Sequence, residues 1–281
     1  KVVGQQSGEI TAEGFAPVIQ SMIDDFTAQG ILDRTPLAGL LDESTLETPS
    51  LLDYPAKLCY AEGGRLFVAD TGHHRILEIQ LSEDGLAGEV VRTFGSGEAG
   101  LQDGSIHEAQ FHDPHGMAFV QSDRGSTLYV ADTENHAIRA IDLVTEQVRT
   151  IAGSGALGRG QRANESDPKA IALRSPLALA ALDQLLLIAM AGSHQIWVLI
   201  DEKQIGVFAG NGAEALVDGP RNQAGFNQPS DLVLDMRHLF VADSEASAIR
   251  AISLNDYPQV FTLVGQGLFE FGDVDGTGST V

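Results

Sequence analysis

A nine-residue segment that occurs four times constrains the fold of this chain more than any other feature. The copies are VADTGHHRI from Val68, VADTENHAI from Val130, IAMAGSHQI from Ile188 and VADSEASAI from Val241. Consecutive copies therefore start 62, 58 and 53 residues apart. A period of this length indicates a repeated supersecondary unit, because a helical heptad or a short solenoid turn repeats over fewer residues. We predict a chain built from four similar units.

Each unit is predicted to contain four short β-strands, the first starting at a proline and the last ending at a pair of glycines. The prolines are Pro55, Pro114, Pro176 and Pro229, and the glycine pairs are Gly95 with Gly97, Gly153 with Gly155, Gly210 with Gly212 and Gly265 with Gly267. The stretches between them are rich in Val, Ile, Leu, Phe and Thr and are bounded by Gly, Asp and Asn, as strands are. Four antiparallel strands repeated around an axis form a propeller blade. The sequence therefore predicts an all-β propeller over residues 54–281.

The second copy carries a resemblance to a known family. The stretch VADTENHAIRAIDL from Val130 resembles the NHL-repeat β-propellers, whose marker is a strand, Ala-Asp-Thr, a turn with Asn or His, and Ile-Arg. The stretches IAMAGSHQIW, VADSEASAIRAISL and LFEFGDVDG are similar to a narrower subfamily, in which the propeller follows a thioredoxin-like domain. The resemblance implies a six-bladed ring, of which this chain, as a truncated fragment, holds blades one to four. A complete ring of four blades is the alternative, since closed propellers have about four to eight blades.

The first fifty residues have a different pattern. Apolar residues at spacings of three and four predict one helix, which Gly30 could end. These residues are Phe15, Val18, Ile19, Met22, Ile23 and Phe26. The stretch KVVGQQSGE before them is predicted to form a strand and a turn. The resemblance implies that residues 1–30 are the closing strand and helix of a thioredoxin-like α/β domain, with residues 31–53 as a linker.

The charge and hydropathy of the chain argue against nucleic acid and membrane partners. Its 39 acidic and 17 basic residues give a net charge of −22, and binding to phosphates depends on Lys and Arg. We place Arg75, Arg139 and Arg250 at equivalent strand positions of different blades rather than in one basic patch. No apolar run approaches the 18 or more residues of a membrane helix. A soluble chain without membrane insertion is expected, and its compartment stays open.

The repeated aspartates and histidines form two columns with a structural and a metal-binding interpretation. They are Asp70, Asp132 and Asp243, and His74, His136 and His194. In the structural interpretation, the aspartates accept backbone donors in the turn, as Asp often does, and the histidines hydrogen-bond across a blade. A metal would need its ligands around one centre. Because the columns break at Met190 and Ser247, we favour the structural role and predict no metal, no cofactor and no catalytic residue in this chain.

Binding residues are predicted at the mouth of the propeller channel, where the loops before the first strands meet and where ligands usually bind. The candidates are Asp113, His115, Arg174, Ser230 and Asp231. They include no repeated nucleophile or base, so we predict a non-catalytic platform for a protein or small ligand beside a thioredoxin-like redox domain. The alternative is a metal-dependent hydrolase or lyase using His115 and Asp231 in the channel. Cys59 is interpreted as a buried hydrophobe, and thiol-redox activity would belong to the upstream domain.

Overall fold

The computed structural model describes residues 12–33, 50–123, 125–158 and 167–267, and the chain divides into two compact units, Lys1–Leu51 and Leu52–Val281. The first unit contains helix α1 (Ala12–Ala28). Gly30 follows it with a φ of 68°, the left-handed conformation that glycine adopts after many helices. The helix predicted from apolar spacing is therefore present. The strand predicted before it and most of the linker lie outside the described residues.

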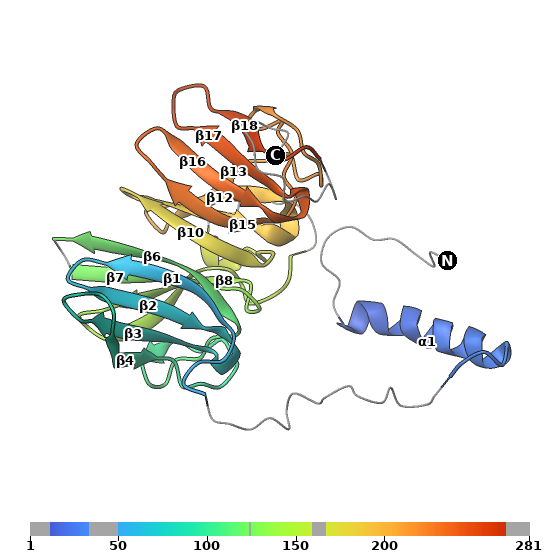
Figure 1. Cartoon of the computed structure of the whole chain (residues 1–281), viewed down its shortest axis with the longest axis horizontal. Helices are drawn as coiled ribbons and strands as arrows, with labels where there is room; N and C mark the ends of the chain where they lie inside the picture. The colour runs from blue at the N-terminus through green and yellow to red at the C-terminus, as the bar shows by residue number, and fades with distance from the viewer. Residues whose placement is uncertain (1–11, 34–49, 124, 159–166, 268–281) are drawn as a thin grey trace. The chain divides into compact units, whose positions relative to one another are not determined.

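The second unit consists of four antiparallel sheets that follow one another along the chain, which confirms the all-β, four-blade prediction (Figure 1). Blade one contains β1 (Pro55–Ala61), β2 (Arg65–Asp70), β3 (Arg75–Leu81) and β4 (Gly88–Phe94). Blade two contains β6 (Pro114–Ser122), β7 (Gly125–Asp132), β8 (Ala137–Asp142) and β9 (Gln147–Ala152), with β5 (Gly104–Ser105) beside β9. Blade three contains β10 (Pro176–Leu182), β11 (Leu185–Met190), β12 (Gln195–Ile200) and β13 (Gln204–Ala209). Blade four contains β15 (Pro229–Leu234), β16 (His238–Asp243), β17 (Ala248–Ser253) and β18 (Gln259–Val264), with β14 (Gly219–Pro220) beside β18.

Short 3₁₀ turns follow the second strand of three blades, at the repeated segment. They are η2 (Thr71–His73), η4 (Ala191–Ser193) and η5 (Ser244–Ala246), and a further turn, η3 (Pro168–Ala170), precedes β10. Each of the three ends in a residue with left-handed backbone: His74, His194 or Ser247. Among the described residues, no helix is long and apolar enough to cross a membrane.

The first strands of the blades lie against one another. β6 packs against both β1 and β10, and β10 packs against β15 (Figure 1). Gly116 shows how closely β6 and β10 approach, because a Cβ atom on it would lie 2.5 Å from the Cα of Ala178. A glycine in a strand often marks such a close backbone approach. The first strands therefore form the inner wall of the assembly.

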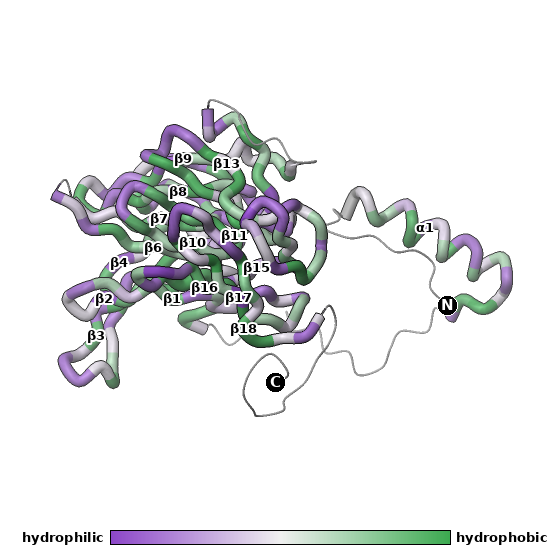
Figure 2. The backbone as a smooth tube through the Cα atoms, turned by 90° about the horizontal axis from the view of Figure 1, so that it is seen from above, coloured by the Kyte–Doolittle hydropathy of each residue, from purple (hydrophilic) through white to green (hydrophobic). Residues whose placement is uncertain are grey.

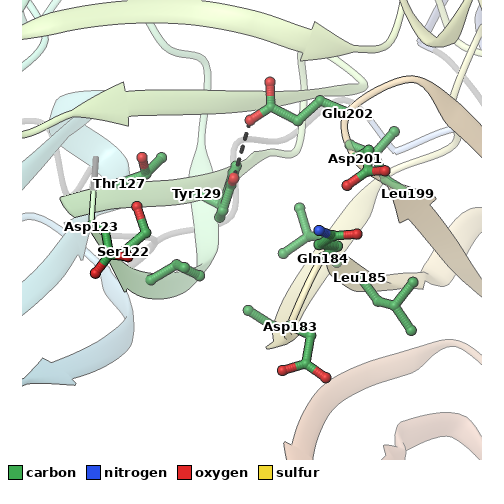
Figure 3. A pocket seen from close by; sticks show the side chains of 13 residues that line it. Ser122, Asp123, Thr127, Tyr129, Asp183, Gln184, Leu185, Leu199, Asp201 and Glu202 are labelled. Atoms are coloured by element: carbon green, nitrogen blue, oxygen red, sulfur yellow. Dashed lines mark hydrogen bonds between the residues drawn. The ribbon is translucent and has the colours of Figure 1, made fainter. Parts of the chain in front are cut away.

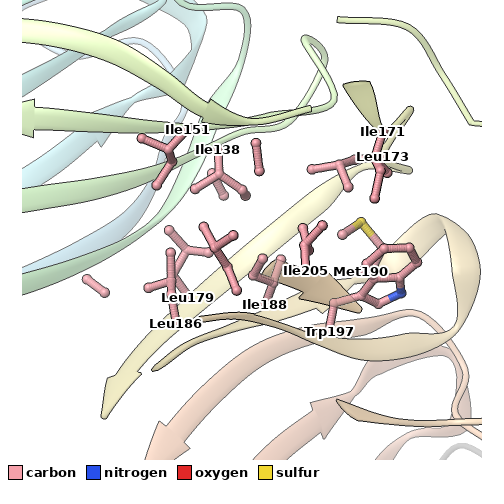
Figure 4. Close-up of a cluster of buried hydrophobic side chains, with 14 of the residues drawn as sticks. Ile138, Ile151, Ile171, Leu173, Leu179, Leu186, Ile188, Met190, Trp197 and Ile205 are labelled. Carbon is pink, nitrogen blue, oxygen red and sulfur yellow. The ribbon is translucent and has the colours of Figure 1, made fainter. Parts of the chain in front are cut away.

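Three hydrophobic cores hold the four blades together, and each lies between two neighbouring blades. The core between blades one and two includes Phe67, Ile76, Phe94, Phe111, Leu128 and Ile141. The core between blades two and three includes Ile138, Ile151, Leu179, Leu186, Ile188 and Trp197 (Figure 4). The core between blades three and four includes Leu187, Ile196, Phe226, Leu239, Val241 and Ile252. Figure 2 shows apolar residues along many strands and hydrophilic residues at many turns.

Equivalent positions reveal one partly covered face on each end blade. Leu58 in β1 is 65% exposed, whereas its counterparts Met117, Leu179 and Leu232 are 7%, 5% and 6% exposed. These side chains face the preceding blade, so we name this side the incoming face. The opposite side of each blade, which faces the following blade, is named the outgoing face. On this face Val233 in β15 is 61% exposed, whereas its counterparts Ala118 and Ala180 in blades two and three are buried. The incoming face of blade one and the outgoing face of blade four are thus only partly covered: Leu58 and Val233 are exposed, whereas Val68 and Leu77, which pair in register on the face of Leu58, are 3% and 1% exposed. The six-blade count stays a prediction.

Candidate functional site

The repeated aspartates anchor the loop that precedes the first strand of their own blade. Asp70, Asp132 and Asp243 are fully buried. Their carboxylates accept the backbone N–H of the residue two positions before the proline. The donors are Asp53 at 2.7 Å, His112 at 2.7 Å and Asn227 at 2.6 Å. These donors lie 16 to 20 residues upstream, so the backbone contact differs from the expected one within the aspartate's own turn. In blade three, the Met190 sulfur takes this place, 3.3 Å from the Arg174 nitrogen.

The repeated histidines reach the next blade. Each has a left-handed backbone, and its Nδ1 accepts a backbone N–H from the residue before the next blade's proline. His74 accepts from Asp113 at 3.3 Å, His136 from Ser175 at 3.2 Å and His194 from Gln228 at 3.2 Å. The threonines of the repeated segment bind the prolines that follow Asp113 and Ser175. Thr71 donates to the Pro114 carbonyl at 2.7 Å, and Thr133 donates to the Pro176 carbonyl at 2.8 Å. We call these Thr and His contacts the interblade latch.

Two fully buried arginines fix the connections between blades. Arg139 donates to Asp132 at 2.7 Å and to the carbonyls of Gln102 and Gln110 in the connection from blade one. Arg250 repeats this arrangement with Asp243 at 2.9 Å and with two carbonyls of the connection from blade three. A buried guanidinium requires hydrogen bonds and a charge partner of this kind. The two terminal nitrogens of each arginine have them, whereas Nε of Arg139 and of Arg250 is buried without a hydrogen-bond partner among the described residues.

The expected equivalence of three arginines is wrong in blade one. Arg139 and Arg250 pair in register with Val130 and Val241, whereas Arg75 pairs with Asp70 itself. Arg75 nevertheless contacts the same carboxylate, with its Nε 2.8 Å from Asp70 Oδ2. The arginine that pairs with the buried aspartate therefore lies at one strand position in blade one and at another in blades two and four. The sequence pattern did not distinguish these two positions.

Blade three replaces both members of the buried ion pair by apolar residues. Met190 stands at the aspartate position and Trp197 at the arginine position, and both belong to the core between blades two and three (Figure 4). Losing only one member would leave a buried charge without its partner, which is far more costly than replacing both. The break of the aspartate column at Met190 is therefore coupled to the replacement of arginine by Trp197. The structural role of the Asp and His columns stays a prediction, with which these contacts agree.

A cavity of about 350 Å³ lies where the first strands of all four blades meet. Its lining includes Lys57, Met117, Leu179 and Asp231. Lys57 Nζ lies 2.8 Å from Asp231 Oδ1 and donates to the Ser230 carbonyl at 2.7 Å. Two predicted channel residues, Ser230 and Asp231, are thus brought together on Lys57, which was not among the candidates.

The lining of this cavity does not include Asp113, His115, Arg174 or Ser230. Asp113 and Arg174 lie in the loops before the first strands, whereas His115 is the second residue of β6. The backbone N–H of Asp113 binds His74, and that of Arg174 contacts Met190. His115 Nδ1 lies 2.9 Å from the Asp113 carbonyl oxygen, so its ring is held by the loop. Within the described parts of the chain, no group of three or more His, Cys, Asp and Glu side chains is placed to hold a metal ion. The five candidates therefore do not converge on one centre.

A larger groove of about 450 Å³, which sequence reasoning missed, lies between blades two and three (Figure 3). Its rim comes from the β6–β7, β10–β11 and β12–β13 turns, at the end of the blades opposite the interblade latch. The Tyr129 hydroxyl lies in the groove and contacts Glu202 Oε1 at 3.1 Å. Burial, followed by the Glu202 charge, raises the pKa of Tyr129 to about 12. Tyr129 therefore stays protonated and donates to Glu202 at neutral pH.

Glu202 is fixed by a second partner on blade two. Arg149 Nη2 donates to its Oε1 at 2.8 Å, and Arg149 Nη1 contacts Oε2. Burial alone would raise the pKa of Glu202, but hydrogen bonds and charge from Arg149 outweigh it and lower that pKa. A bidentate pair of this kind joins the two blades beside the groove. Glu202 is consequently a structural carboxylate.

The fold, the repeats and their contacts define an NHL-repeat β-propeller, and the NHL repeat family matches residues 52–78. The chain belongs to this family. It is 36% identical over its whole length to Protein SUPPRESSOR OF QUENCHING 1, chloroplastic, from Arabidopsis thaliana, of which it spans 27%. Over 82% of its length it is 39% identical to NHL repeat-containing protein 2 from Gallus gallus, of which the match spans 34%. Among solved structures, a nidogen/laminin complex aligns with 73% of this chain and 61% of its own, at 17% identity and a TM-score of 0.47.

Proposed function

We propose that this chain is a non-catalytic propeller that holds a protein partner beside a thioredoxin-like redox domain of a longer protein. The observation that carries the proposal is the use of the repeated polar side chains. The Asp and Arg pairs hold loops, and the Thr and His contacts join blades. A groove between two blades adds accessible polar side chains that these contacts do not use, which is a binding feature rather than a catalytic constellation.

The arrangement of domains belongs to the same proposal. We assign residues 1–30 to the end of the thioredoxin-like domain, residues 31–53 to a linker and residues 54–281 to blades one to four of a six-bladed ring. The two partly covered blade faces, with Leu58 and Val233 exposed, support a ring with further blades. The relatives support it by their length, since the matches span 27% and 34% of them.

The experiment that tests the proposal separates binding from turnover. The purified chain is assayed against ester, lactone and glycosidic model substrates, with and without Zn²⁺ and Mn²⁺, and its bound metal is measured. We expect no turnover above buffer and metal well below one equivalent. In parallel, the longer protein is cross-linked with and without residues 54–281, and we expect partner cross-links that require the propeller. Turnover that is lost in His115→Gln and Asp231→Asn would contradict the proposal and establish the hydrolase or lyase alternative.

A further inference from the structure

The groove between blades two and three exists because one aromatic side chain is missing there. Between blades one and two, the equivalent space is filled by Phe67 and Phe119, whose rings stack with centroids 6.1 Å apart. Strand register places Tyr129 at the position of Phe67 and Ala181 at that of Phe119. A methyl group cannot fill the volume of a phenyl ring, so the space beside Tyr129 stays open.

The groove combines an apolar floor with a negatively charged rim. Leu186 and Leu199 on the floor are part of the core between blades two and three, and Leu185 lies beside them. The exposed carboxylates of Asp123, Asp183 and Asp201 stand around the opening (Figure 3). Within the described ranges, no hydrogen bond or ion pair engages these three carboxylates. Two cations lie near this rim: Arg149 on the neighbouring strand is already paired with Glu202, and Lys169 acts on the Glu202 carboxylate through its charge.

We propose that this groove binds an arginine or lysine side chain of a basic peptide segment in the partner protein. This inference rests on the proposed function and names the chemistry of the partner. The long methylene stem of such a side chain would lie on the leucines, and its charged head would meet the aspartates. A groove of about 450 Å³ lies within the size range of ligand pockets. The strong negative charge of the chain, −22 overall, adds attraction for such a segment.

Other occupants match the groove less well. A divalent cation needs several oxygen ligands around one point, and no such group occurs within the described ranges. An acidic or phosphorylated segment would face the three aspartates. An uncharged sugar would leave those carboxylates without a charge partner. The basic side chain is the occupant that uses both the apolar floor and the charged rim.

The experiment measures binding of a fluorescein-labelled peptide of alternating Gly and Arg by anisotropy, at about 150 mM salt so that distant charges are screened. The matched control peptide has citrulline at each arginine position, which keeps the shape and removes the charge. Ala181→Phe fills the groove without changing any charge, and it copies a pair already present between blades one and two. Its thermal unfolding midpoint is measured to verify folding. We expect at least tenfold weaker binding to this variant and to citrulline.

A second pair of variants tests the charge. The triple substitution Asp123→Asn, Asp183→Asn and Asp201→Asn removes the rim carboxylates, and Asn tolerates the left-handed backbone of Asp183 and Asp201. The control removes three exposed carboxylates of blade one instead, through Glu62→Gln, Glu83→Gln and Glu89→Gln. We expect at least tenfold weaker binding for the first triple and less than twofold for the second.

Two outcomes would overturn the inference. Either Ala181→Phe binds the arginine peptide as tightly as the unaltered chain, or both triples weaken binding equally, which indicates attraction by the overall charge alone. If the propeller still cross-links to a partner in the longer protein while these variants bind normally, the proposed function stands and the groove assignment fails. If the groove binds the peptide but no propeller-dependent cross-link forms, the proposed function fails instead.

Discussion

At the scale of single residues, the buried ion pairs show how strongly one substitution depends on another. Arg139 and Asp132 are both fully buried and bonded to each other. Arg139→Met leaves a buried carboxylate without its charge partner, so we expect a loss of about 3–5 kcal/mol in unfolding free energy. Adding Asp132→Met removes that charge and reproduces the apolar chemistry of Met190 in blade three, so the double variant should recover about half of the loss. Urea denaturation of the two variants measures both values, and a double variant that is no more stable than Arg139→Met would contradict the argument.

The more exposed carboxylates of the same networks predict a pH dependence. Asp103 accepts from Arg139 at 2.9 Å and from Thr150 at 2.8 Å, and Asp218 has the corresponding contacts with Arg250 and Thr262. Burial opposes ionisation of Asp103 and Asp218, but these hydrogen bonds and charges outweigh it and lower both pKa values. Their stabilising contribution is therefore present above the unfolded pKa, near 3.9 for Asp, and is lost as the pH falls through the folded values.

We expect the unaltered chain to lose stability more steeply between about pH 5 and pH 3 than the Asp103→Asn, Asp218→Asn double variant. Thermal unfolding midpoints across this range measure the difference. Asp123→Asn serves as the control, because the Asp123 carboxylate is exposed and unengaged within the described ranges. Parallel pH profiles for the chain and the double variant would contradict the linkage.

At the scale of elements, the interblade latch should stabilise a blade only where another blade follows it. Replacing latch residues is therefore expected to lower the unfolding free energy in blade two but not at the end of blade four. In Thr133→Val with His136→Ala, the Pro176 carbonyl and the Ser175 N–H lose their partners, and the Ser175 side is buried. Leaving a buried polar group unsatisfied costs about 1–3 kcal/mol. The exposed Ser247 holds the histidine position of blade four, so Ser247→Ala should change the unfolding free energy by less than about 0.5 kcal/mol. Equal losses for the two variants, measured by denaturation, would contradict this role.

The sequence predicted elements better than contacts. Each first strand begins at its predicted proline, because proline and the polar turns act locally. The carboxylate contact of Asp132, in contrast, joins residues 20 positions apart, and the histidine contacts join different blades, which local turn preferences do not encode. Arg75 was wrongly predicted to be equivalent to Arg139 and Arg250, because the comparison matched residue types and did not know the strand register.

The groove could have been found by comparing equivalent strand positions. Ala181 stands where blade two has Phe119 and blade one has Tyr60. A small residue at a position where the other blades have large side chains indicates a void. The strand register must be known before such positions can be compared. The acids on the rim gave no separate signal, because Asp is common in turns. Two of the channel candidates, Asp113 and Arg174, lie in loops whose backbone is used for anchoring first strands, and the binding role of all five stays a prediction.

At the scale of the whole molecule, the described chain has four blades but three interblade cores. The partly covered incoming face carries Leu58 and Tyr60, and the partly covered outgoing face carries Val233 and Phe261, all of them exposed. Apolar patches of this kind mark interaction surfaces in soluble proteins. They predict self-association of the isolated chain, since each face has the shape of one half of a blade interface.

Substitution on the incoming face tests what covers it. In the isolated chain, Leu58→Gln with Tyr60→Gln should reduce self-association in sedimentation velocity and change the unfolding free energy by less than about 0.5 kcal/mol, because both side chains are already exposed. Met117→Gln, at the equivalent buried position of blade two, should cost about 2–4 kcal/mol. In the longer protein, further blades would bury Leu58 and Tyr60, so the double substitution should there become as costly as Met117→Gln. If it stays harmless in the longer protein, the face is not a blade interface, and the six-bladed ring is wrong.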